Sequence, residues 1–94
     1  MAAGFKGMDT DEVRRVAIKF GTKASEIENI IKEVDRLVDS DVANAWRGSD
    51  ADKFRSEWKG THKTQLKKAA NALNTAKSKA QSNAAKQDQT SSTY

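Results

Sequence analysis

The side chains that could take part in acid–base or metal chemistry are few and scattered. His62 is the only histidine among 94 residues and there is no cysteine, so no set of nitrogen and sulfur ligands can hold a zinc ion. Neither a Ser, His and Asp set nor a pair of buried carboxylates can be assembled for catalysis. Gly4-Phe5-Lys6-Gly7 follows no strand, so it is not a phosphate-binding loop. The sequence predicts a protein that is not an enzyme, with no catalytic residue, metal, cofactor or small-molecule substrate.

Charge is distributed unevenly between the two halves of the chain. Residues 1–45 carry seven Lys or Arg and nine Asp or Glu (7 − 9 = −2), whereas residues 46–94 carry ten and four (10 − 4 = +6). The basic run consists of Lys63, Lys67, Lys68, Lys77, Lys79 and Lys86. Its simplest interpretation is a solvated helix face, and its alternatives are a nucleoid-type nucleic-acid-binding protein and a membrane-active amphipathic effector. Nucleic acid is disfavoured because no aromatic residues interleave with these lysines, and the membrane role because this helix is weakly apolar.

Trp46-Arg47-Gly48 lies at the centre of the chain, between two helical patterns. Helices often end on glycine, because it adopts a left-handed backbone without steric strain. Ser49, followed three residues later by Asp52, predicts a capped start of the next helix. We therefore expect a turn over residues 47–49.

A second Trp-X-Gly occurs at residues 58–60 and is not expected to form a bend. The apolar spacing runs through it without a change of phase, at Phe54, Trp58, His62 and Leu66. Gly48 is therefore the predicted turn.

Apolar residues at steps of three and four predict helices over about residues 10–46 and 50–85. Arms of equal length, each about 50 Å long at about 1.5 Å per residue, close into an antiparallel hairpin. The apolar stripe is about three heptad columns wide, which two helices cannot cover, so we expect an all-α hairpin that dimerises into a four-helix bundle. The predicted hairpin and dimer packing residues are Val13, Val16, Phe20, Ile27, Ile30, Ile31, Val34, Leu37, Phe54, Trp58, His62, Leu66 and Leu73.

The two ends of the chain are predicted to lie outside the hairpin, which covers residues 9–85. Residues 1–8 read as a flexible N-terminal arm, and the Ser-, Gln- and Thr-rich residues 86–94 as a disordered C-terminal tail. No apolar run is long enough for a membrane span, and the N-terminus lacks the apolar core of a cleaved signal peptide. Export, if it occurs, is expected to be independent of a signal peptide.

The chain resembles the WXG (Trp-X-Gly) family of early-secreted-antigen-like proteins over roughly residues 8–85. The resemblance rests on Trp46-Arg47-Gly48 at the centre of a chain without Pro or Cys, with Phe54 and Trp58 following at helical spacing. It implies a dimeric helical hairpin, exported folded by the type VII secretion machinery of Gram-positive or mycobacterial-type bacteria. Such proteins are secreted effectors, adaptors for larger substrates or parts of the machine, so the expected location is cytoplasmic before export and secreted or envelope-associated afterwards.

The chain departs from the family in its export motif. Members that carry the signal usually have Tyr-X-X-X-Asp/Glu beyond the second helix, whereas the only tyrosine here is Tyr94. Because one dimer partner can supply the signal for both, this departure favours a heterodimer with a sister WXG protein. Against it, the acidic first half and basic second half are complementary, which favours a homodimer. We expect the homodimer, with the heterodimer as the alternative.

Overall fold

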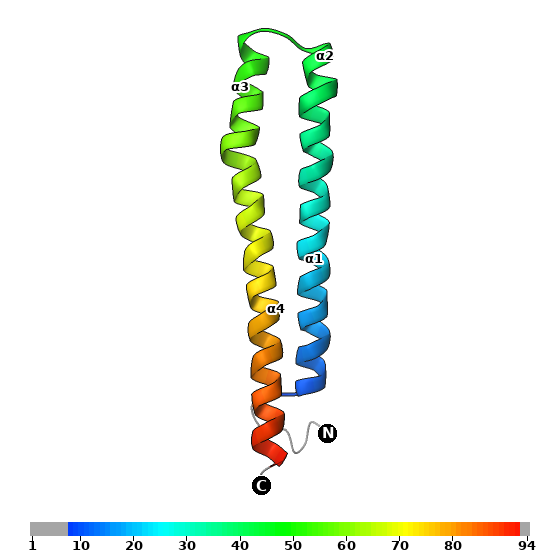
Figure 1. Cartoon of the computed structure of the whole chain (residues 1–94), viewed down its shortest axis with the longest axis vertical. Coiled ribbons are helices and arrows are strands. Elements are labelled where there is room, and N and C mark those ends of the chain that lie inside the picture. Colours follow the sequence, from blue (N-terminus) through cyan, green and yellow to red (C-terminus); the bar gives the residue numbers. More distant parts are fainter. Residues whose placement is uncertain (1–7, 93–94) are drawn as a thin grey trace.

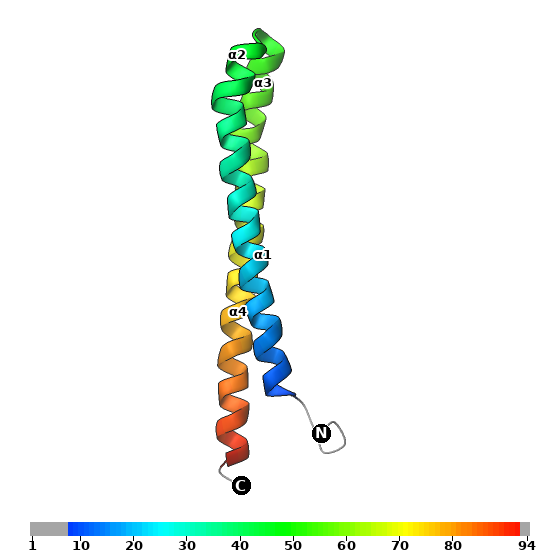
Figure 2. The same ribbon diagram turned by 90° about the vertical axis from the view of Figure 1, so that its right-hand side faces the viewer.

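The structure, a computed structural model, describes residues 8–92 of the chain, and this part is all-helical. Two long helical arms lie side by side and are joined by a single turn, which confirms the predicted antiparallel hairpin (Figure 1). A view turned by 90° shows the same two arms crossing at a shallow angle (Figure 2). The hairpin is a rod with principal extents of 68 × 18 × 17 Å.

Each arm is interrupted by one π-helical turn near the tip of the hairpin. The first arm consists of α1 (Thr10–Arg36), the π-helical turn η2 (Leu37–Val42) and α2 (Ala43–Ala45). The second arm consists of α3 (Ser49–Glu57), the π-helical turn η3 (Trp58–His62) and α4 (Lys63–Ser92). The turn between the arms is formed by residues 46–48.

A side-chain cap fixes the start of α1. The Asp9 carboxylate accepts a hydrogen bond from the backbone N–H of Glu12 at 3.2 Å, and the Asp9 carbonyl accepts one from Val13 N–H at 2.9 Å. The Glu12 side chain binds the Arg15 guanidinium at 2.9 Å. These acidic residues at the positive pole of the helix dipole stabilise the first turn.

The π-helical turn η3 corrects the expectation that the second arm keeps its phase through Gly60. The backbone N–H of Lys63 donates to the carbonyl of Trp58, five residues earlier, so one extra residue enters this turn. Trp58 is buried, but His62 is rotated out and exposed, and the half-buried Lys63 takes the position that faces the first arm. His62 is therefore not a packing residue of the hairpin.

The arms meet along a narrow seam made mostly of alanine. The buried residues of this seam are Ala17, Ala24, Ile31, Val38, Ala51, Trp58, Ala70 and Ala84. On α1 they recur every seven residues, which keeps one column facing the second arm along the whole rod. Alanine lets the helix backbones approach closely but buries little apolar area, at about 25 cal/mol per Å². A single hairpin therefore has a small core.

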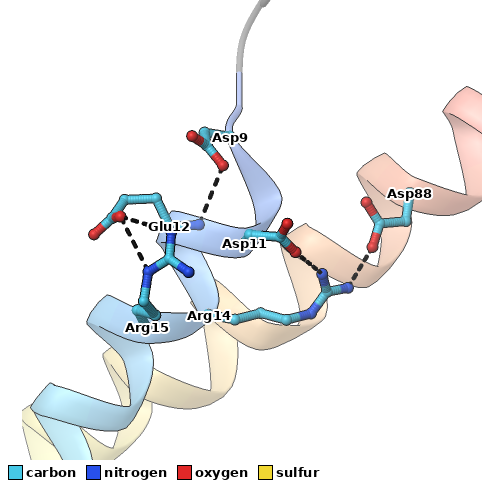
Figure 3. A network of polar contacts seen from close by, with 6 residues as sticks. All are labelled: Asp9, Asp11, Glu12, Arg14, Arg15 and Asp88. Carbon is cyan, nitrogen blue, oxygen red and sulfur yellow. Dashed lines mark hydrogen bonds and ion pairs between the residues drawn. The ribbon is translucent and has the colours of Figure 1, made fainter. Parts of the chain in front are cut away.

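The predicted C-terminal boundary at residue 85 is wrong, because α4 continues to Ser92. Ala84 is fully buried against the first arm, and the Arg14 guanidinium binds the Asp88 carboxylate at 2.5 Å. Arg14 also approaches Asp11 at 3.8 Å, so it links the start of α1 to the end of α4 (Figure 3). Contact with Arg14 holds the pKa of Asp88 below its usual value. These tertiary contacts hold the polar 86–92 segment helical despite its composition.

Two predicted segments fall partly outside the described residues. Of the N-terminal arm predicted over 1–8, residues 1–7 lie outside, and of the tail predicted over 86–94, residues 93–94 lie outside. Tyr94 belongs to the latter. Within residues 8–92, no helix has the length and apolar character needed to cross a membrane.

Candidate functional site

Trp46 and Phe54 form an exposed aromatic pair at the tip of the hairpin. The first arm ends where Trp46 N–H donates to the Val42 carbonyl at 2.8 Å and the Trp46 backbone becomes extended. The Trp46 and Phe54 ring centroids lie 5.8 Å apart with the planes tilted by 37°. Trp46 remains 44% exposed and Phe54 40% exposed. A pair of large aromatic residues that pack on each other and still face solvent is typical of a docking surface.

Gly48 makes the reversal of the chain possible, but as the N-cap residue that precedes α3 rather than as the residue that ends the first arm. Its φ of 115° and ψ of −179° lie in a region that is essentially restricted to glycine. Its carbonyl accepts the first helical bond of α3, from Asp52 N–H at 3.0 Å. Arg47, between Trp46 and Gly48, is exposed at the tip.

The predicted cap by Ser49 and Asp52 is wrong. Gly48 occupies the N-cap position and Ser49 is already the first residue of α3, so no side chain caps this helix. The Asp52 carboxylate instead forms an ion pair with Arg55. Glycine is tolerated at an N-cap, and here the need for a positive φ takes precedence over a capping side chain.

Below the tip, a polar cluster centred on Asp35 joins the two arms. One Asp35 oxygen accepts a hydrogen bond from the indole N–H of Trp58 at 2.8 Å, and the other binds the Lys63 ammonium at 2.6 Å. Both hydrogen bonds hold the pKa of Asp35 below its usual value, and the bond with Lys63 contributes more than the bond with Trp58. Four residues nearer the tip on each arm, the Lys59 ammonium binds the Asp39 carboxylate at 2.7 Å, and this bond raises the pKa of Lys59.

These ion pairs all lie on one side of the seam, which we name the polar side. Asp35 and Asp88 each follow a seam residue by four positions. A shallow groove on this side is lined by Glu28 and Lys32 of α1 and by Lys67 of α4, among other residues. In an antiparallel pair, equivalent heptad columns of both helices point to the same side. The opposite side of the hairpin is therefore also shared by both arms.

That opposite side is the apolar face of the hairpin. A residue of this face lies three positions after, four positions before or one position before a residue of the seam. Its larger members are Val13, Val16, Phe20, Ile27, Ile30, Val34, Leu37, Phe54, Leu66 and Leu73. From the second arm, Ala69, Ala76 and Ala80 fill the same columns. Ile30 is 51% exposed and Leu37 is 43% exposed. Part of this stripe is therefore left uncovered by the hairpin itself.

The structure divides the predicted packing residues into three groups. Two are buried in the seam: Ile31 and Trp58. Seven are half-buried along the apolar face: Val13, Val16, Phe20, Ile27, Val34, Leu66 and Leu73. Four are exposed and lie outside the seam: Ile30, Leu37, Phe54 and His62. The seam lies at one edge of the apolar stripe, which is why the residues at its other edge remain open.

A comparison with protein families identifies the chain. The family whose profile matches is WXG100, described as "Proteins of 100 residues with WXG", and the match covers residues 7–90. The chain belongs to the WXG100 family. No curated protein and no solved structure matches it.

WXG100 membership places the tip motif in context. It marks the chain as a small helical protein of a type VII secretion-related kind, and such proteins are small secreted helical proteins that are not known as enzymes. The name-giving residues are Trp46 and Gly48, and they form the turn of the hairpin. Within residues 8–92 of this WXG100 protein, no group of three His, Asp or Glu side chains lies together to hold a metal ion.

The apolar spacing includes most of the seam alanines but does not single them out as packing residues, and the Asp35 cluster was not predicted. Bulkier side chains at the same helical spacing dominate the pattern, so the alanines were not chosen as the residues that join the arms. The Asp35 cluster has a detectable signal, since an antiparallel hairpin turning at Gly48 brings Asp35 opposite the lysines of residues 59–63. Pairing opposite charges at similar distances from the turn would have found it.

Proposed function

We propose that this WXG100 protein is exported by a type VII secretion system, or serves that system as an adaptor or component, as a dimer of helical hairpins. The observation that carries the proposal is the family's Trp-X-Gly motif at the tip of the hairpin, with the Trp46 ring exposed beside Phe54. In this proposal the protein starts in the cytoplasm and reaches the secreted or envelope fraction by a route independent of a signal peptide. It has no catalytic role.

The apolar face supports the dimer. The seam buries only three residues larger than alanine, whereas ten larger apolar residues occupy the apolar face or the adjoining tip. Proteins of about 100 residues bury a modest fraction of their surface, so covering a stripe of this length adds substantially to stability. Two hairpins that place their apolar faces together form a four-helix bundle.

The chemistry of the face favours a second copy of the chain as the partner. The first arm contributes large side chains to it, whereas the second arm contributes mainly Leu66, Leu73 and alanines. Bulky and small surfaces complement each other when α1 of one copy lies against α4 of its partner. The acidic first half and basic second half add a favourable charge arrangement to the same pairing.

The native mass of the purified protein tests the partner directly. A homodimer is expected at twice the chain mass of 10.3 kDa. A monomer that becomes a stable 1:1 complex only with a sister WXG protein would overturn the homodimer and retain the bundle. A monomer with no such complex would overturn both.

The tip is the proposed contact with the secretion machinery. Replacing Trp46 with Ala removes an exposed ring, so the hairpin is expected to fold normally while export to the culture supernatant falls. Ile18→Ala is the matched control, because Ile18 is 60% exposed and lies far from the tip on the polar side. Trp58→Phe serves as a second control, since it perturbs a buried tryptophan close to the tip without altering the exposed pair.

The outcome is read by immunoblotting supernatant and cell pellet, with circular dichroism of each purified variant. Loss of export for Trp46→Ala but not for Ile18→Ala supports the proposal. Export that persists after deletion of the type VII ATPase would overturn it. Equal export of the Trp46→Ala and parent proteins would remove the tip from the docking surface.

A further inference from the structure

The second arm carries a long stretch of lysines without acidic neighbours. From Trp58 to Gln87 the chain contains seven lysines and neither Asp nor Glu. Two of them are used inside the hairpin, where Lys59 binds Asp39 and Lys63 binds Asp35. The other five are Lys67, Lys68, Lys77, Lys79 and Lys86. None of them forms an ion pair with a residue of the described 8–92 segment. The hairpin's own packing therefore leaves most of this charge unused.

Three of these lysines lie in one straight row on the outward side of α4. This lysine face follows alternating steps of three and four residues, all of them exposed, and consists of Gln65, Lys68, Ala72, Thr75, Lys79, Ser82 and Lys86. Such spacing keeps the positions on one side of a helix. The row points away from both the seam and the apolar face, so it stays accessible when two hairpins pair through that face.

The shape of the row favours a flat anionic partner. α4 runs without interruption over Lys63–Ser92 (Figures 1 and 2), so Lys68 and Lys86 are separated by about 27 Å along one helix. A planar surface can meet all three lysines at once, whereas each phosphate strand of a DNA duplex winds around the duplex axis and so follows a straight row of lysines over only part of this length. The lysine face also lacks the aromatic side chains that stack on single-stranded bases.

The residues between the lysines define the kind of contact. They are small or uncharged polar side chains, namely Ala72, Thr75 and Ser82, with Gln65 at one end. No large apolar side chain is available to enter the hydrocarbon region, so binding would be electrostatic and peripheral. We propose that the lysine face docks the hairpin lengthwise on the surface of an anionic phospholipid membrane.

Vesicle flotation of the full chain tests this proposal at neutral pH and low salt. Vesicles of phosphatidylglycerol and phosphatidylcholine in equal parts should bind the protein, and vesicles of phosphatidylcholine alone should not. Raising the salt concentration to about 0.5 M should release the protein, because the salt screens the attraction between the lysines and the anionic headgroups. Vesicle contents should not leak.

Two triple variants separate the lysine face from net charge. In Lys68→Gln/Lys79→Gln/Lys86→Gln, binding should weaken about 100-fold, since each lysine close to an anionic membrane contributes a factor of about five. The control variant removes the same charge from exposed positions of α1, as Lys19→Gln/Lys32→Gln/Arg36→Gln, and should bind within a few-fold of the parent. None of these six side chains joins the two arms, so circular dichroism should be unchanged.

Each other result overturns the proposal. Absence of binding to the anionic vesicles at low salt would leave the lysines as a solvated face. Equal weakening of both triple variants would assign binding to net charge rather than to this face. Leakage, or equal binding to uncharged vesicles, would indicate apolar insertion, and tighter lysine-dependent binding to a DNA duplex would make the partner a nucleic acid. The proposal concerns a surface separate from the tip and the dimer face, so it stands or fails independently of the proposed function.

Discussion

Ile30 and Leu37 provide the sharpest perturbation of the proposed dimer, because they lie on the apolar face yet contribute little to the hairpin. Ile30 is 51% exposed and Leu37 is 43% exposed, so roughly half of each side chain remains to be buried by a partner. Full burial of such a side chain contributes about 1.5–3 kcal/mol, which leaves about 0.7–1.5 kcal/mol each. In a homodimer the double variant Ile30→Ser/Leu37→Ser removes four side chains. The dimer should therefore lose about 3–6 kcal/mol.

That loss corresponds to a dissociation constant raised about 10²- to 10⁴-fold. Sedimentation equilibrium over a dilution series measures it, with circular dichroism confirming that the helices remain. Ile18→Ser is the matched control, since Ile18 is 60% exposed but lies on the polar side of the seam. If Ile18→Ser dissociates the dimer as strongly as the double variant, or if the double variant leaves the dissociation constant unchanged, the apolar face is not the interface.

Two further perturbations test the turn and the Asp35 cluster. Gly48→Ala places a side chain at φ 115° and should destabilise the hairpin by about 1–3 kcal/mol in urea unfolding. In Gly60→Ala the added Cβ meets no atom within 4 Å, so this variant should stabilise the hairpin by about 0.5–1 kcal/mol. Equal effects of the two substitutions would refute the argument from backbone conformation. Asp35→Asn loses the charge bound by Lys63 and should destabilise the protein by about 1 kcal/mol at pH 7. Because the folded-state pKa of Asp35 is lowered, its stabilisation is present above the ordinary pKa of about 4 and lost as the pH falls below it, so the variant should show a shallower loss of stability in acid. Parallel pH profiles of variant and parent would contradict this assignment.

The helices and the turn could be predicted from the sequence because their determinants are local. Apolar steps of three and four residues between Val13 and Leu37 specify a helix whatever it packs against. Gly48 is the single residue with a positive φ among the described residues 8–92. The absence of proline and the equal arm lengths then leave an antiparallel hairpin as the simplest arrangement.

The interior of the candidate site could not be read with the same accuracy. Three adjacent columns of α1 are apolar, and the sequence does not indicate which one faces the second arm. The structure selects the column of Ala17, Ala24, Ile31 and Val38 at one edge of the stripe, which leaves Ile30 and Leu37 open. The π-helical turn at residues 58–62, which exposes His62 and brings Lys63 to Asp35, also has no clear signature in residue spacing.

The sequence by itself therefore determined that this protein is a pair of amphipathic helices with a glycine turn and a Trp-X-Gly tip, since each follows from contacts within a few residues. Only the tertiary structure decided how the helices are rotated about their axes, and with that which apolar side chains are buried and which are left for a partner. It also decided that the polar residues 86–92 stay helical, through Ala84 in the seam and the Arg14–Asp88 pair. The physical reason is that helix rotation and end contacts depend on the summed energy of residues far apart in the chain, which no local pattern records.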